Sequence, residues 1–193
     1  QFSFVYCDSD EFESEIESLG VSKPPALAIW AGRAKYVYSG KMKVASMQQW
    51  VQEYLAGSLK AFLKSAPVPD EDDGDVRIIV GSTFEDIVMN PEDDVLIEFY
   101  APWCGHCQQL QPKYRKLAKK VKNSDHLVIA KMDATENDPP ADFNVEGFPT
   151  LYLVTAGNNQ IVPYDGQREV PDFLKFLKAN ARNPVKTKSK RKK

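Results

Sequence analysis

Two cysteines separated by two residues, in Cys104-Gly105-His106-Cys107, are the part of this sequence best suited to chemistry. Thiol–disulfide exchange needs an attacking thiolate, a second thiol that resolves the mixed disulfide, and access for a large substrate. A spacing of two residues in a tight turn brings the second sulfur within bonding reach of the first. The pattern therefore predicts a redox-active pair; the alternative is an ordinary disulfide or two inert buried thiols.

The position of the pair along the chain assigns different roles to its two sulfurs. A strand-like apolar run, Val95 to Tyr100, precedes it, and helical spacing begins at Gly105. Because a helix N-terminus stabilises negative charge, we expect Cys104 to be the attacking thiol and Cys107, one turn inside the helix, to be the shielded resolving thiol. An imidazolium at His106 stabilises the reduced form, which makes the pair a better oxidant of other thiols.

The remaining cysteine and the two histidines do not suggest a metal site. Three cysteines are too few for a disulfide scaffold or a four-cysteine zinc site, and His126 is remote in sequence from the pair. We therefore expect no metal and no cofactor. Cys7 follows a predicted strand and has no visible partner, so it is expected to be buried and inert.

Charge and hydropathy exclude several classes of partner. The net charge is −2, and no apolar run reaches the roughly 18 residues of a membrane span. Residues 186–193 form a strongly basic tail and residues 70–75 an acidic run, and both are expected to be solvated, mobile segments. A nucleic-acid arm or a nuclear signal is the alternative for the tail. We expect neither a nucleic-acid nor a membrane partner, and a monomer.

Prolines followed by like charges divide the chain into two segments. The predicted organisation is a first domain over residues 1–66, a linker over 67–75, a second domain over 76–181 and a basic tail over 182–193. Because the chain begins at Gln1 without a signal-like segment, we expect it to be an excised or processed piece of something longer.

The second segment predicts an α/β domain with a mixed sheet. Its expected order is β-α-β-α-β-α-β-β-α, which is that of the thioredoxin fold. The expected strands cover residues 76–80, 95–100, 127–132, 150–154 and 160–163, and the expected helices cover 84–88, 105–120, a short stretch near 141, and 170–179. Ser82 or Thr83 should cap the first helix, and Pro112 should kink the second.

The first segment predicts only the second half of such a fold. A strand over residues 2–6, a helix over 10–19, a hairpin of 26–30 with 35–38, and a helix over 46–55 give the order β-α-β-β-α. Such a partial domain should be marginally stable alone.

Several motifs resemble the catalytic domains of the protein disulfide isomerase family. They are the stretch from Asp94 through Cys107, the stretch from Val128 to Thr135, and Gly147-Phe148-Pro149-Thr150. The resemblance covers nearly the whole chain, and the first segment resembles the end of the noncatalytic domain that precedes the last catalytic domain.

The resemblance implies roles for three charged residues. Glu98 would accept and return the proton of Cys107, and Lys131 would be its buried partner, since an isolated buried carboxylate is costly. Arg168 matches a mobile arginine whose charge lowers the pKa of Cys107 when that thiol must attack. The alternatives are a structural ion pair for Glu98 and Lys131, and an ordinary surface residue for Arg168.

The resemblance also implies a substrate-binding edge beside the sulfurs. Pro149 matches a cis-proline that faces the active site and exposes the backbone of Phe148 for pairing with substrate. Trp103 would flank the site as an apolar contact, with simple packing as the alternative. In the first segment Trp30, Tyr36, Tyr38 and Trp50 could contribute to a client site, although their spacing also suits a core.

The expected activity is dithiol–disulfide exchange that forms and rearranges disulfides in folding secretory proteins. The implied partners are unfolded or misoxidised client proteins and an upstream thiol oxidase or glutathione, in the lumen of the endoplasmic reticulum. A retention tetrapeptide of the Lys-Asp-Glu-Leu type is absent, which we attribute to truncation. The alternatives are a thioredoxin-like reductase, which His106 in place of proline argues against, and a chaperone or scaffold whose thiols are incidental.

Overall fold

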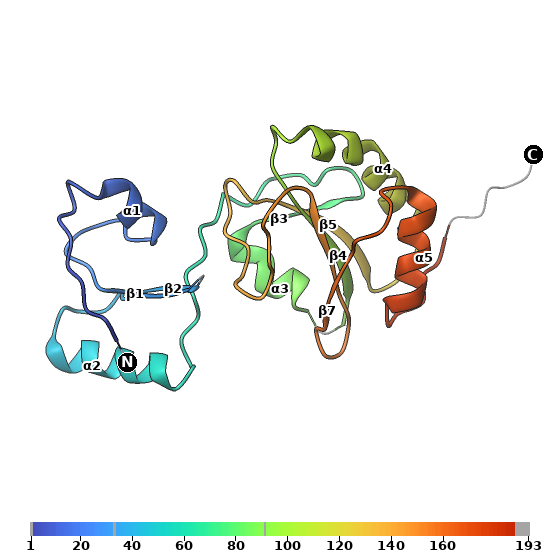
Figure 1. Cartoon of the computed structure of the whole chain (residues 1–193). Coiled ribbons are helices and arrows are strands. Elements are labelled where there is room, and N and C mark those ends of the chain that lie inside the picture. Colours follow the sequence, from blue (N-terminus) through green and yellow to red (C-terminus); the bar gives the residue numbers. More distant parts are fainter. Residues whose placement is uncertain (1, 33, 91, 188–193) are drawn as a thin grey trace, which may run out of the picture. The chain divides into compact units, whose positions relative to one another are not determined.

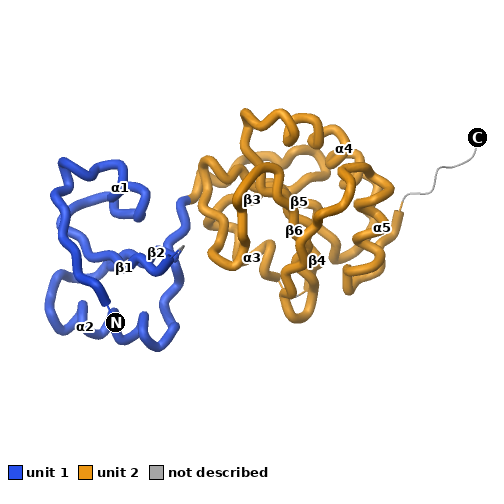
Figure 2. The backbone as a smooth tube through the Cα atoms, viewed as in Figure 1, with its two compact units in different colours: residues 1–64 blue, residues 65–193 orange. Residues whose placement is uncertain are grey.

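The computed structural model describes residues 2–32, 34–90 and 92–187 of the 193-residue chain. The chain divides into two compact units, residues 1–64 and 65–193 (Figure 2). None of the helices in the described residues is both long and apolar enough to cross a membrane.

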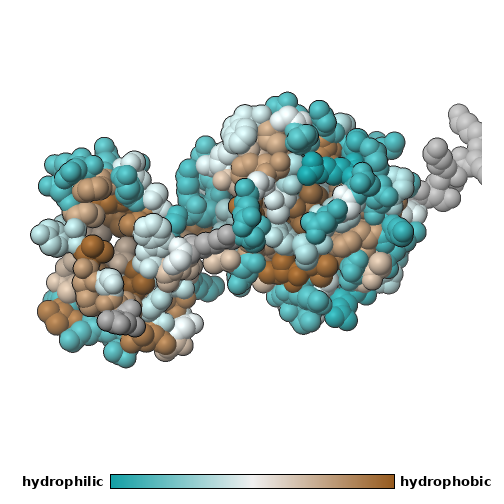
Figure 3. Space-filling view, viewed as in Figure 1, coloured by the Kyte–Doolittle hydropathy of each residue, from teal (hydrophilic) through white to brown (hydrophobic). Residues whose placement is uncertain are grey.

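The first unit is a two-stranded hairpin with two helices. Its elements are α1 (Glu13–Ser18), β1 (Ala28–Ala31), β2 (Ala34–Val37) and α2 (Val44–Leu55), and β1 pairs with β2 antiparallel. Hydrophobic residues reach its visible surface in Figure 3, and Trp30 is 72% exposed. Trp50, by contrast, is buried against Tyr38, and Tyr36 packs edge-on against Tyr54.

Two expectations for the first unit are wrong. Residues 2–6 form no strand, because a strand needs a neighbour to satisfy its backbone groups and neither β1 nor β2 pairs with them. Cys7, expected to be buried at the end of that strand, is exposed for the same reason: the segment that carries it has no sheet to join.

The second unit is a five-stranded mixed sheet with helices on both faces (Figure 1). The strand order is β3-β5-β4-β6-β7, in which β4 lies parallel to β5 and antiparallel to β6. The elements are β3 (Arg77–Ile79), the 3-10 turn η1 (Gly81–Thr83), α3 (Phe84–Val88), β4 (Asp94–Tyr100), α4 (Gly105–Val121), β5 (Leu127–Asp133), β6 (Thr150–Val154), β7 (Ile161–Pro163) and α5 (Val170–Asn180). This confirms the thioredoxin fold.

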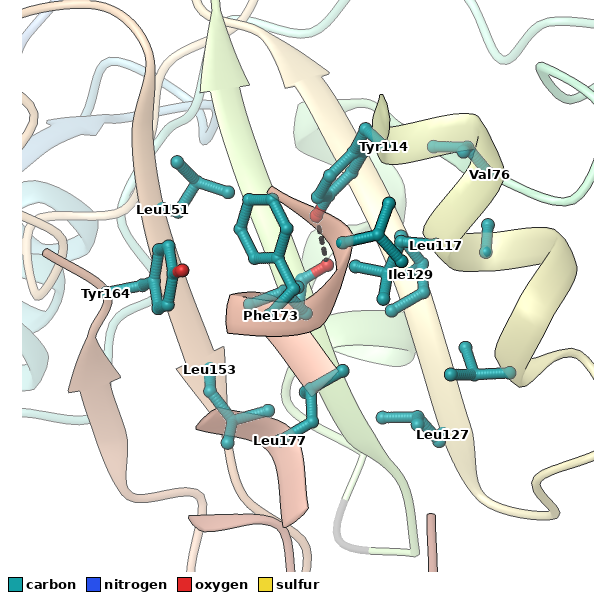
Figure 4. Packing of buried hydrophobic residues seen from close by; sticks show 14 of the residues in the cluster. Val76, Tyr114, Leu117, Leu127, Ile129, Leu151, Leu153, Tyr164, Phe173 and Leu177 are labelled. Carbon is teal, nitrogen blue, oxygen red and sulfur yellow. Dashed lines mark hydrogen bonds between the residues drawn. The ribbon is translucent and has the colours of Figure 1, made fainter. Parts of the chain in front are cut away.

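Alternation along β4 sends its side chains into two different cores. Val95, Ile97 and Phe99 pack with α3 on one face. Leu96 points to the other face, where α4 and α5 bring Tyr114, Leu117, Phe173 and Leu177 over the sheet (Figure 4). The same alternation places Glu98, two residues after Leu96, on the α4 side.

Two further expectations fail in the second unit. No helix forms near Ala141, where the residues after Asp138-Pro139-Pro140 make turns and the Phe143 N–H bonds the carbonyl oxygen of Pro140. Asp138 and Pro139 each precede a proline, which disfavours the helical conformation at both residues. Neither Ser82 nor Thr83 caps α3 with its side chain, since the Thr83 hydroxyl instead bonds the backbone of Val80. α4 continues through Pro112.

The acidic segment before β3 is held against the second unit by specific contacts. The backbone N–H of Ala66 donates to Asn137 Oδ1 at 2.9 Å, and that oxygen also accepts from Gly81 N at 3.0 Å. Asp72 pairs with Arg77 at 3.1 Å. The Asp73 side chain is only 19% exposed, so the expectation of a solvated run is wrong at this residue. The basic tail lies partly outside the described residues.

A buried carboxylate fastens the end of α5 to the start of β4. Asp94 is fully buried and accepts hydrogen bonds from the backbone N–H groups of Ala156, Arg182 and Asn183, at 3.1, 2.9 and 2.7 Å. These groups would otherwise be unsatisfied at the end of the domain. The Asp94 side chain therefore joins the start of β4, the loop after β6 and the segment after α5.

We expect Asp94→Ala to lower the free energy of unfolding by about 3 kcal/mol, because it leaves three backbone donors without an acceptor. Urea denaturation of the full chain measures this difference. Asp142→Ala, at an exposed aspartate, is the matched control. Equal midpoints for the two variants would contradict the role given to Asp94.

Candidate active site

The two cysteines lie where β4 gives way to α4. Cys104 is the N-cap of α4, and its sulfur accepts a hydrogen bond from the backbone N–H of Cys107 at 3.2 Å. The two sulfurs are 2.6 Å apart, and neither cysteine is in a disulfide. The strand–turn–helix geometry expected from the sequence therefore brings both thiols together at the helix N-terminus.

The two thiols differ in their surroundings. Cys104 retains 7% exposure, whereas Cys107 retains 1%. Burial, reinforced by the hydrogen bond with the Cys104 sulfur, raises the pKa of Cys107 to about 12. At neutral pH the Cys107 thiol therefore keeps its proton, and any step in which it attacks needs a base.

A cis-proline loop forms the wall opposite the helix. The Phe148–Pro149 bond is cis, as the resemblance implied. The Cys104 sulfur lies 3.5 Å from the carbonyl oxygen of Phe148, and the Phe148 ring meets Trp103 edge-on at 6.0 Å. Trp103 is 72% exposed, so it offers an apolar surface beside the sulfurs.

Gly105 and His106 occupy the exposed first turn of α4. A Cβ added at Gly105 would meet no atom within 4 Å, so the surrounding packing does not require a glycine there. His106 lies between the cysteines in sequence and is open to solvent.

Glu98 supplies a buried carboxylate on the α4 side of β4. It is fully buried, and its Oε1 atom has no hydrogen-bond partner among the residues that the structure describes. Burial raises the pKa of Glu98 to about 7, although the charges of Lys131 and Arg168 act in the opposite direction. Such a carboxyl group can take up and release a proton near neutral pH.

The expected direct pairing of Glu98 with Lys131 is wrong. The two residues are register partners on β4 and β5, but the Lys131 ammonium forms its ion pair with Asp73 at 2.5 Å. Lys131 also donates to Gln111 Oε1 at 3.0 Å, and Gln111 Nε2 donates to Glu98 Oε2 at 3.3 Å. An amide therefore stands between the two charges.

Sequence reasoning missed Gln111 and Asp73. Gln111 is four residues after Cys107 on α4, so helical spacing alone places both on the face that covers β4. Asp73 lies in an acidic run with five other residues around it, and nothing in that run singles it out. Only the packing of the segment before β3 against α4 and β5 selects Asp73.

Arg168 lies on the exposed segment before α5. Its charge nonetheless acts on Glu98, where it lowers the pKa of that carboxyl group against the effect of burial. Within residues 2–32, 34–90 and 92–187, no group of three or more histidine, cysteine, aspartate or glutamate side chains is placed to hold a metal ion.

Comparisons with known proteins agree with this geometry. Residues 75–179 match the thioredoxin family. The chain is 42% identical over 189 residues to chicken (Gallus gallus) protein disulfide-isomerase A3, covering 94% of this chain and 37% of the relative. It is 40% identical over 196 residues to human (Homo sapiens) protein disulfide-isomerase A4, covering 97% of this chain and 30% of the relative.

A solved structure supports the same relationship. The solution structure of the first thioredoxin domain of mouse protein disulfide-isomerase A4 matches with a TM-score of 0.53 and 33% identity, over 65% of this chain and 89% of that domain. The chain spans only about a third of the length of the curated relatives.

The buried carboxyl group should make stability depend on pH. Because the pKa of Glu98 rises from 4.5 to about 7 on folding, the folded chain binds more protons than the unfolded chain between these values. Stability contributed by the protonated carboxyl group is thus present below pH 4.5 and is lost as pH rises to about 7, by about 3 kcal/mol.

We expect Glu98→Gln to remove most of this loss, so that the variant gains on the parent chain between pH 5 and pH 8. Chemical denaturation at both pH values measures the gain. Glu85→Gln, at an exposed glutamate of α3, is the control. A constant difference between the Glu98→Gln variant and the parent at the two pH values would refute the raised pKa.

Proposed function

The chain belongs to the thioredoxin family, among the protein disulfide isomerases, and we propose that it forms and rearranges disulfides in client proteins through Cys104 and Cys107. The observation that carries this proposal is the pair of adjacent sulfurs, one partly accessible and one buried, at the N-terminus of α4. The cis-proline wall and the exposed Trp103 ring beside them suit an extended, partly apolar polypeptide.

In the reducing direction, the Cys104 thiolate attacks one sulfur of a client disulfide. A mixed disulfide forms, and the other client sulfur leaves as a thiolate. Cys107 then loses its proton and attacks the Cys104 sulfur, which releases the second client thiolate and leaves a Cys104–Cys107 disulfide. Isomerisation follows when a free thiolate of the client attacks the mixed disulfide and displaces Cys104 before Cys107 attacks.

In the oxidising direction the same steps occur in reverse. A client thiolate attacks the Cys104–Cys107 disulfide and expels the Cys107 thiolate, which takes up a proton. A second client thiolate then attacks the mixed disulfide and frees Cys104. Two electrons have passed from the client to the pair, so reoxidation requires an oxidant, for which we propose an upstream thiol oxidase or glutathione disulfide.

Glu98 is the proposed proton acceptor for Cys107. A thiol with a pKa of about 12 cannot attack at useful rates without a base, and Glu98 has a pKa of about 7 and an unpartnered Oε1. For Arg168 we propose a second contribution, in which its charge approaches Cys107 while the thiolate forms. His106, in the first turn, would stabilise the Cys104 thiolate.

The wider setting is also proposed from the family. We place the protein in the lumen of the endoplasmic reticulum, acting as a monomer on unfolded or misoxidised secretory clients. Residues 1–66 are proposed to end a noncatalytic domain, residues 67–75 to link it to the catalytic domain of residues 76–181, and residues 182–193 to form a tail. Trp30, the most exposed of the four aromatic residues considered, is the candidate for client contact in the first unit.

We expect the double variant Cys104→Ser, Cys107→Ser to lose catalysed refolding of a scrambled disulfide protein, because no sulfur remains to carry the exchange. Cys7→Ser, which removes the exposed cysteine, is the matched control and should keep the activity. If the double variant still suppresses aggregation, the chain has a chaperone side activity. If it fully retains catalysed refolding, the proposed thiol–disulfide exchange activity is excluded.

We expect a reduction potential of about −180 mV for the Cys104–Cys107 pair, as in disulfide isomerases. Equilibration of the Cys7→Ser chain with glutathione buffers, followed by alkylation and mass analysis, measures it. A potential of about −270 mV, typical of thioredoxin, would instead support a reductase and contradict the role of His106.

We expect Glu98→Gln to slow turnover at pH 7 on the order of 100-fold, because the Cys107 proton loses its acceptor. Stopped-flow measurement of the step that resolves the mixed disulfide isolates this effect from the first attack by Cys104. An unchanged rate for that step would leave Glu98 with a structural role.

A further inference from the structure

A chain of polar contacts runs from the buried Glu98 to the surface. Gln111 Nε2 donates to Glu98 Oε2 at 3.3 Å, and Lys131 Nζ donates to Gln111 Oε1 at 3.0 Å. The same ammonium pairs with Asp73 Oδ2 at 2.5 Å. Arg115 Nε closes the chain with bonds of 2.7 and 2.9 Å to the two Asp73 oxygens.

The contacts fix the orientation of the Gln111 amide. An ammonium has only donors, so the amide must turn its oxygen toward Lys131 and its NH₂ group toward the carboxylate. The reverse orientation would set oxygen against oxygen at Glu98 and donor against donor at Lys131. Gln111 therefore bridges the two charged groups through its amide, and it donates to the charged form of Glu98.

Asp73 holds the ammonium on the far side of that amide. Lys131 is 7% exposed, so its charge needs a partner, and two carboxylates compete for it. Asp73 has the contact, and Arg115 orients both Asp73 oxygens. The pKa of Asp73 is lowered by Arg115 and Lys131 against the effect of burial, so this carboxylate stays ionised at neutral pH.

Other charged and titratable groups bear on Glu98 from each packed element. They are Lys131 on β5, Cys107 and Tyr114 on α4, Arg168 before α5, and Tyr100 on β4 itself. Only Lys131 and Arg168 carry a positive charge, and Arg168 is exposed. Among the buried groups, the position of the Lys131 ammonium therefore has the largest influence on the pKa of Glu98.

We propose that Asp73 and Gln111 are positioning residues for the proton acceptor of the resolving step: Asp73 keeps Lys131 from pairing directly with Glu98, and Gln111 links the two through its amide. This inference rests on the proposed function of Glu98. A direct ion pair would stabilise the carboxylate and weaken it as a base, whereas an isolated carboxylate would stay protonated. The intervening amide sets the acceptor between these limits.

The two positions should respond in opposite directions. In Asp73→Asn the ammonium loses its competing carboxylate and turns to Glu98, so the pKa of Glu98 falls by about one pH unit or more. In Gln111→Leu the carboxylate loses the one hydrogen-bond donor that it has among the described residues, while Lys131 stays with Asp73, so the pKa of Glu98 rises. A general loss of stability would not produce opposite signs.

The full chain with ¹³C-labelled glutamate side chains reports this directly. Carboxyl chemical shifts are followed against pH, and Glu98→Gln assigns the Glu98 signal. Asp75→Asn, which removes a neighbouring charge paired with Lys122 at 3.6 Å, and Gln109→Leu, at an exposed position of α4, are the matched controls. Both controls should leave the Glu98 titration unchanged.

The pH profile of the step that resolves the mixed disulfide should move with the titration, downward in Asp73→Asn and upward in Gln111→Leu. Unchanged Glu98 titrations in both variants, or shifts of the same sign, would overturn the inference even if the parent chain is an active isomerase. Inactivity of the parent chain would instead sink the proposed function, because the titrations do not depend on turnover. Should Asp73→Asn fail to fold, Gln111→Leu decides alone.

Discussion

A carboxylate with no access to water sits on the inner face of β4, and the arrangement around the two sulfurs depends on how the fold accommodates it. Glu98 interrupts the apolar run that follows Asp94 in β4, and among the described residues its register partners in the sheet offer no charge in direct contact. The cost of ionising this group in the core appears as its raised pKa. A group that is expensive to ionise but not fully protonated at neutral pH is suited to exchanging protons with a thiol.

The sulfurs obtain their different environments from a single feature, the passage from β4 into α4. At the first cap position a side chain faces the free N–H groups of the helix, and three residues later a side chain points down onto the sheet. Cys104 and Cys107 occupy these two positions, so Cys104 keeps a small exposed area while Cys107 is almost fully buried. The cis-proline loop then encloses Cys104 from the opposite side.

Segments that connect the strands and helices of the second unit are held in place by buried polar side chains. Asn137 fixes Ala66 and Gly81 from one loop, Asp94 fixes the residues after α5, and Asp73 reaches from the segment before β3 into the polar network behind Glu98. A buried polar side chain that accepts hydrogen bonds from several backbone N–H groups fixes more of the backbone than a surface contact does. Breaking it would leave those buried donors unpaired, which is costly. Through Asp73 this anchoring also bears on the electrostatics of the proposed acceptor.

Local patterns in the sequence determined the second domain and the position of its redox pair. Apolar alternation and helical spacing placed the strands from Val95, Leu127 and Thr150 and the helix from Gly105 to within a few residues, because those signals are local. They failed at residues 2–6, where a strand needs a partner that β1 and β2 do not provide, and near Ala141, where consecutive prolines end in turns.

The sequence also indicated that Glu98 and Lys131 would lie side by side, which their register on β4 and β5 bears out. It could not tell which groups each would contact. Oxygens of three side chains compete for one ammonium, and the choice of Asp73 and Gln111 over Glu98 depends on contacts made by elements far apart in the chain. Only the tertiary structure decides such a competition, because the free energy of a buried charge is set by everything packed around it.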